Sequence, residues 1–98
     1  MSGKKATPGF AVGSAVFLQT VTFAYTGRVV ALTDGLLWIT DAAWIPETGR
    51  FAQAMASGAF EEVEPYPEGQ VVAISLGVIV TIMPWAHKLP RKQIPEAT

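Results

Sequence analysis

Residues 12–45, VGSAVFLQTVTFAYTGRVVALTDGLLWITDAAWI, decide the fold class of this chain. Apolar and polar residues alternate along it, and two turn signals interrupt it, YTG at 25–27 and DG at 34–35. Alternation with a period of two is typical of β-strands, and Asp-Gly is a strong signal for a tight hairpin turn. The stretch therefore predicts three consecutive strands, at residues 15–25, 28–33 and 36–40.

The rest of the chain is expected to add one helix and a second hairpin. Residues 49–57 are followed by Gly58, a typical residue at a helix C-terminus, so we expect one short helix between strands three and four. Two apolar stretches within residues 70–83 are separated by Gly77, which predicts two further strands paired about that glycine. The segment between helix and hairpin, residues 60–69, is rich in glutamate and predicts a solvated acidic loop rather than a metal site.

Length and composition indicate one small domain. A chain of 98 residues builds a single modest core, so an apolar fraction of 50% with only 15% charged residues predicts that other copies of the chain cover part of its surface. The longest apolar run, residues 71–85, is too short to span a membrane as a helix and contains a glycine and a proline. We expect a disordered tail at 1–8, a single β-barrel domain at 9–86 and an extended, basic, proline-containing tail at 87–98.

Charge is divided between the body of the chain and its two ends. Residues 13–86 hold two cations against seven acids, whereas the two ends together hold five cations against one acid. An acidic body repels the phosphates of nucleic acid, so a nucleic-acid partner is disfavoured. The basic ends are interpreted as solvated segments that aid solubility.

Two groups of apolar residues, glycines and aspartates carry a family resemblance. The first group is Gly13, Val16, Leu18, Phe23, Gly27, Val29, Asp34, Leu37, Ile39 and Asp41, and the second is Val72, Ile74, Gly77, Ile79, Val80 and Ile82. Their pattern resembles the two motifs of the Sm-like fold, a small five-stranded, strongly bent β-barrel of the SH3-like class. RNA-binding Sm proteins carry Asn and Arg where this chain has Leu37 and Leu76, so the resemblance implies the fold without the RNA site.

Three further segments, TVTFAYTGRVV, DAAWIPETGRFAQAM and EVEPYP, look like small uncharacterised proteins of tailed bacteriophages and prophages. That likeness implies a virion component, or an accessory protein that blocks a host defence, for example by sequestering a nucleotide signal. It also implies a location in the cytoplasm of a bacterial host cell or in the virion.

No catalytic or metal-binding constellation is predicted. The chain has a single histidine, no cysteine and no glycine-rich phosphate loop, so neither an enzyme nor a cofactor is expected. The candidate contacts for a ligand or partner are Tyr25, Arg28, Trp38, Trp44, Arg50 and Trp85. Aromatic rings offer surfaces for stacking or anchoring, and subunit contacts are the favoured interpretation of the tryptophans. Arg28 and Arg50 either pair with Asp41 or Glu47, which we favour, or meet an anionic ligand.

These observations lead to two hypotheses about function. The first is a non-enzymatic, phage-type small β-barrel protein that forms a ring or similar homo-oligomer and acts through its oligomeric surface, in assembly or binding. The alternative is a counter-defence protein that sequesters an anionic nucleotide between subunits, using Arg28, Arg50 and a tryptophan. An RNA-binding Sm-like ring is disfavoured by the two leucines and the acidic body.

Overall fold

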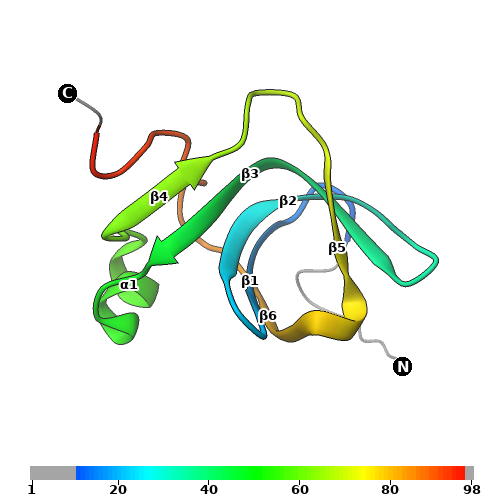
Figure 1. Ribbon diagram of the computed structural model, residues 1–98, viewed down its shortest axis with the longest axis horizontal. Coiled ribbons are helices and arrows are strands. Elements are labelled where there is room, and N and C mark those ends of the chain that lie inside the picture. The colour runs from blue at the N-terminus through cyan, green and yellow to red at the C-terminus, as the bar shows by residue number, and fades with distance from the viewer. Residues whose placement is uncertain (1–10, 97–98) are drawn as a thin grey trace.

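The computed structural model describes residues 11–96, so the expected disordered tail at 1–8 lies outside the described residues (Figure 1). Its architecture is mainly β, as the alternating pattern predicted, with one short α-helix in the described part of the chain. The strands are β1 (Ala15–Thr20), β2 (Ala24–Thr33), β3 (Leu36–Glu47), β4 (Glu62–Pro65), β5 (Val72–Ser75) and β6 (Ile79–Pro84). The helices are α1 (Phe51–Ser57) and the 3-10 helix η1 (Leu76–Val78).

The six strands form one antiparallel sheet. Its main path runs β4-β3-β2-β1-β6, and β5 pairs with the half of β3 that β4 leaves unpaired. Within residues 11–96, β5 and β6 do not pair with each other, so the sheet is not closed. The sheet has one strand more than expected, because β4 forms where the sequence indicated an acidic loop.

The first hairpin turn lies closer to the N-terminus than the sequence indicated. The chain reverses between Thr20 and Phe23, where the Thr20 hydroxyl accepts the Phe23 N–H at 3.0 Å and the Thr20 N–H donates to the Phe23 carbonyl at 2.7 Å. Gly27, where we expected the turn, instead lies inside β2 opposite Val16. A Cβ at that position would lie 2.8 Å from Ile39 Cδ1, so this glycine permits close packing rather than chain reversal.

The second hairpin turn is where the sequence predicted it. Asp34 and Gly35 both have positive φ, 50° and 77°, as a type I′ turn requires. The third strand, however, continues past its expected end to Glu47. Asp41 adopts a φ of 50° at a bulge where two residues of β3 oppose Gly27 of β2, so the strand bends and goes on.

The expected second hairpin about Gly77 is wrong. The Ser75 hydroxyl accepts the Gly77 N–H at 3.2 Å, and η1 replaces a hairpin turn. This short helix carries the chain from β5, which pairs with β3, to β6, which pairs with β1. The two strands therefore present separate outer edges, one at each side of η1 (Figure 1).

The α-helix lies between β3 and β4 and ends as expected at Gly58, whose φ is 78° and whose N–H donates to the Ala54 carbonyl at 2.7 Å. It begins after Arg50, with no side-chain cap. Neither helix among residues 11–96 has the length and apolar character that crossing a membrane requires.

The core has two clusters, which lie on the two faces of β1. Val16 and Leu18 belong to one cluster and Phe17 to the other, because successive strand side chains point to opposite faces. Phe17 is fully buried and packs against both Phe60 and Trp85, with ring centroids 5.9 and 5.6 Å away, and those two rings also stack on each other at 5.4 Å. Residues of the same chain therefore cover both faces of this strand.

The described part of the expected C-terminal tail lies against β4. Backbone hydrogen bonds of 2.7 and 2.9 Å join Val63 and Ile94 in a β-bridge. The Arg91 guanidinium donates to the carbonyls of Ala42 and Tyr66 at 2.8 and 2.9 Å. This segment therefore brings its basic residues back to the sheet.

Candidate functional site

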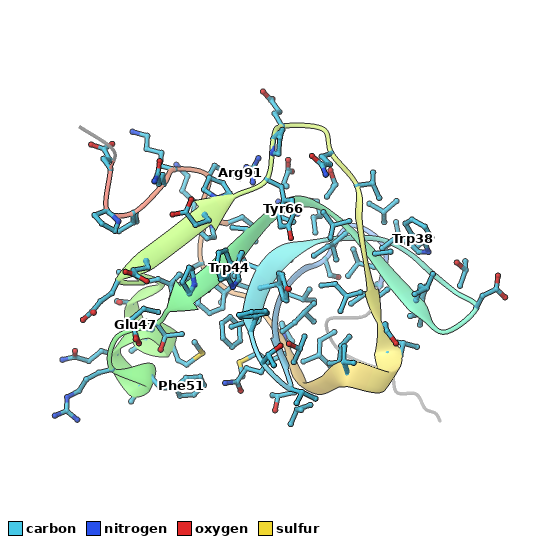
Figure 2. The ribbon with its side chains drawn as sticks, in the orientation of Figure 1. Trp38, Trp44, Glu47, Phe51, Tyr66 and Arg91 are labelled. Carbon is cyan, nitrogen blue, oxygen red and sulfur yellow. The ribbon has the colours of Figure 1, made fainter. Side chains whose placement is uncertain are left out.

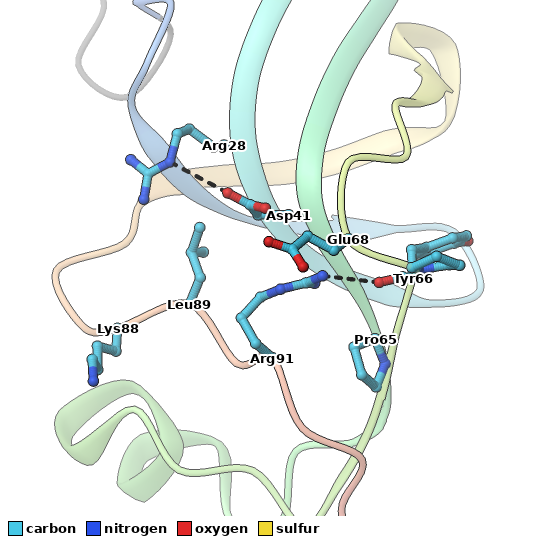
Figure 3. Close-up of a pocket in the computed structure, with 9 residues that line it drawn as sticks. Arg28, Asp41, Pro65, Tyr66, Glu68, Lys88, Leu89 and Arg91 are labelled. Carbon is cyan, nitrogen blue, oxygen red and sulfur yellow. Dashed lines mark hydrogen bonds and ion pairs between the residues drawn. The ribbon is translucent and has the colours of Figure 1, made fainter.

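A groove of about 690 Å³ lies where the C-terminal segment passes the bend of the sheet and the loop after β4 (Figure 3). Arg28 and Asp41 come from β2 and β3, and the remaining walls come from two segments far apart in sequence. The lining residues are Arg28, Asp41, Pro65, Tyr66, Pro67, Glu68, Lys88, Leu89 and Arg91. Residues 11–96 contain five cations, Arg28, Arg50, Lys88, Arg91 and Lys92, and three of them line this groove.

Arg28 makes the ion pair that the sequence analysis favoured. Its Nε lies 3.9 Å from Asp41 Oδ2, and its Nη1 donates to the Gly13 carbonyl at 2.9 Å. The two side chains are 46% and 39% exposed, so water screens the pair and its contribution to stability is about 0–1 kcal/mol. The Arg28 guanidinium therefore lines the groove, and its ion pair with Asp41 is weak.

Arg91, like Lys88, lines the groove and was missed by sequence reasoning. It is half-buried, and two short hydrogen bonds to the backbone carbonyls of Ala42 and Tyr66 fix its position. A guanidinium has five N–H donors, so these two bonds leave further donors for a ligand. No sequence signal distinguishes Arg91 from the other tail cations, since its role depends on contacts with residues 25 and 49 positions earlier.

The opposite walls of the groove differ in charge. Figure 3 shows Arg28 and Lys88 on one side, Glu68 and Tyr66 on the other, and Arg91 between them. Lys88 is exposed and makes no ion pair with any of the described residues. The groove therefore combines three cations with two acids in a part of the chain, residues 11–96, that carries five cations against eight acids.

Tyr25 is not among the residues that line this groove. Burial raises the pKa of its hydroxyl above the usual value, and the neighbouring Tyr66 raises it further. The Tyr25 hydroxyl therefore stays protonated and neutral at pH 7, so it brings no charge to this region.

The three tryptophans do not meet. Trp38 lies near the β2–β3 hairpin and donates to the Thr33 hydroxyl at 3.0 Å, whereas Trp44 lies towards the other end of β3 (Figure 2). Trp44 packs edge-on against Phe23, with ring centroids 5.3 Å apart, and its indole N–H is buried without an acceptor among the described residues. Trp85 is only 7% exposed and is a core residue.

Arg50 is also remote from the groove. It is exposed, lies just before α1, and lines a separate small pocket of about 210 Å³. Of the six candidate residues, Arg28 is therefore the one that the structure places in the groove. One chain does not bring together Arg28, Arg50 and a tryptophan.

Comparisons of the chain with protein-family models, curated proteins and solved structures found no match. Residues 11–96 also contain no group of three or more His, Cys, Asp or Glu side chains placed to hold a metal ion.

Proposed function

We propose that this protein is a non-enzymatic, self-assembling binding protein whose copies join through the outer edges of β5 and β6. The observation that carries the proposal is a group of large aliphatic side chains exposed beside these edges, which we call the apolar edge. Its members are Val21, Leu32, Leu76, Val78 and Val80, and each is between 41% and 73% exposed.

The members of the apolar edge are close in space. The Val21 N–H donates to the Val78 carbonyl at 3.0 Å, which brings the β1–β2 turn against η1. Leu32 and Leu76 line an apolar cavity of about 180 Å³ together with Leu37, Ile79 and Ile82. Leu76 and Val78 both belong to η1, and an exposed apolar group of this kind typically marks an interaction site.

The strand edges beside this surface have little protection. Free edges of soluble proteins usually carry charged residues or are covered, because an unprotected edge pairs with other chains. Residues 69–87, which include both β5 and β6, contain no Asp, Glu, Lys or Arg. Each strand also keeps one edge without a partner among residues 11–96.

A second copy of the same chain is the occupant that fits best. An edge without charged residues offers no electrostatic selection for a foreign partner. The four residues of β5 in one copy can instead pair with part of the six-residue β6 of the next copy. Such head-to-tail contacts use two different surfaces, and they close into a ring when the rotation between copies allows it. The high apolar fraction of the chain is consistent with this assembly.

The strand order also supports a barrel of the Sm-like or SH3-like kind. Without β4, the order is β6-β1-β2-β3-β5, and η1 links the two end strands across the open side. We interpret α1 and β4 as an insertion into five barrel strands. The likeness of three segments to tailed-phage proteins favours a role as a virion component or an accessory protein in an infected bacterial cell.

Val80→Lys is expected to dissociate the assembly. Val80 is 70% exposed on β6, and an interface with a second copy would bury the new ammonium group without a partner. Such burial costs several kcal/mol, so we expect association to weaken by at least about 100-fold. Sedimentation velocity over a concentration series measures this directly.

Val12→Lys is the matched control, because Val12 is equally exposed, at 72%, and lies outside the apolar edge. We expect this variant to sediment like the unaltered protein. A wild-type protein that sediments as a monomer at all concentrations, or equal effects of the two substitutions, would contradict the proposal.

A further inference from the structure

We infer that the groove lined by Arg28, Lys88 and Arg91 binds a phosphate monoester of a small organic molecule. The site is formed within one chain and does not depend on self-assembly. It differs from the expected site between subunits, because Lys88 and Arg91 of the C-terminal segment take the place of Arg50 beside Arg28.

The first argument is the fixed position of Arg91. Its guanidinium is oriented by the carbonyls of Ala42 and Tyr66, so binding a ligand does not require this long side chain to be ordered anew. Guanidinium groups match phosphate oxygens in geometry and form strong charge-assisted hydrogen bonds with them. Arg91 therefore provides a prearranged donor at the centre of the groove.

The second argument is the charge around that donor. Lys88 makes no ion pair among the described residues, and the screened pair between Arg28 and Asp41 leaves Arg28 available to a stronger anion. A phosphate monoester carries a charge of about −1.5 to −2 at pH 7, so it gains more than a carboxylate from three neighbouring cations. The remainder of the described surface is mainly acidic, which leaves this groove as the favourable place for an anion.

The third argument concerns the organic part of the ligand. The groove volume of about 690 Å³ is far more than an inorganic phosphate needs, and the Pro65-Tyr66-Pro67 segment forms one wall. Two proline rings and a tyrosine ring give apolar surface on which a flat group can pack. Glu68 lies on the same side and favours a ligand whose organic part carries hydrogen-bond donors rather than a second anionic group (Figure 3).

The test is an NMR titration of the isotope-labelled full chain with phenyl phosphate, inorganic phosphate and benzoate at constant ionic strength. We expect phenyl phosphate to cause saturable shifts at the amides of Tyr66, Lys88 and Arg91, with weaker binding of the other two compounds. Binding of benzoate as tight as that of phenyl phosphate would contradict a phosphate site. Shifts that do not saturate, or that lie outside the groove, would overturn the inference.

Three variants test the assignment of residues. Lys88→Gln removes a cation from the groove and is expected to weaken phenyl phosphate binding by about 2- to 5-fold, whereas Glu68→Gln removes a repelling acid and is expected to strengthen it by a similar factor. Lys92→Gln is the matched control, since Lys92 belongs to the same segment but does not line the groove. Equal weakening by Lys88→Gln and Lys92→Gln would show a general effect of charge and would contradict the site.

Discussion

Phe17→Ala is expected to lower the free energy of unfolding by about 3–5 kcal/mol. Phe17 is fully buried at the centre of the aromatic cluster, in contact with both Phe60 and Trp85. Its removal leaves a cavity beside these two rings, which the segments after α1 and β6 hold in place. Urea denaturation at a fixed protein concentration measures the change.

Phe51→Ala is the control for this prediction. Phe51 lies on α1 with its ring edge-on to Phe17, at a centroid distance of 6.2 Å, but it is 44% exposed. We expect it to cost about 1 kcal/mol, because only part of its apolar surface is withdrawn from water. Equal losses for Phe17→Ala and Phe51→Ala would mean that the aromatic cluster does not form the core.

Gly58→Ala is expected to cost about 2–4 kcal/mol, from two separate causes. The φ of 78° at the end of α1 is unfavourable for any residue with a Cβ, by about 1–2 kcal/mol. A Cβ at this position would also lie 2.5 Å from Cγ of His87, which forces the C-terminal segment away from the helix. The His87 Nε2–H donates a hydrogen bond to the Met55 carbonyl at 2.7 Å, so the displacement would break that contact too.

Gly35→Ala separates these two causes. Gly35 has a nearly identical φ of 77°, but no atom lies within 4 Å of the position of its Cβ. We therefore expect Gly35→Ala to show the backbone cost alone, about 1–2 kcal/mol. Thermal unfolding of both variants compares the two, and equal costs would contradict the packing of His87 against the end of α1.

The sequence correctly predicted those turns and helix ends that depend only on residues adjacent in the chain. The Asp34-Gly35 turn and the helix end at Gly58 follow from conformations that the residues themselves favour, and the structure has both. The prediction of a turn at Gly27 was wrong, because a residue distant in the sequence decides the role of this glycine. Its place in β2 depends on the Ile39 side chain of another strand, which no local pattern reveals.

Pairing between distant segments was the part that the sequence did not reveal. The apolar run on either side of Gly77 looks like a hairpin, but β3 and β1 offer partners for β5 and β6 that a local reading does not consider. The acidic segment after α1 becomes β4 because Val63 faces the core and the edge of β3 is free to receive it.

The candidate site was predictable only in part. Arg28 and its pairing with Asp41 followed from the scarcity of cations in the body of the chain. Lys88 and Arg91 follow Arg28 by about sixty residues and reach it only because the C-terminal segment folds back onto the sheet. Trp85, one of the candidate contacts, is a core residue, because composition does not distinguish a buried ring from an exposed one.

The faces of β1 are not where a second copy packs, because Phe60 and Trp85 of the same chain cover the face that carries Phe17. Beside β5 and β6, in contrast, the five aliphatic side chains of the apolar edge remain exposed. The proposal therefore depends on the pairing of these two edges between copies.

Cross-linking between two single-cysteine chains tests that pairing most directly. The natural chain has no cysteine, so Ala73→Cys on β5 and Val80→Cys on β6 each introduce a unique thiol. The two variants, given tags of different mass, are mixed and treated with a short bis-maleimide reagent that tolerates small differences in register. We predict that the main cross-linked product joins one Ala73→Cys chain to one Val80→Cys chain. Chains that remain uncross-linked, or that join only to copies of the same variant, would contradict assembly through β5 and β6.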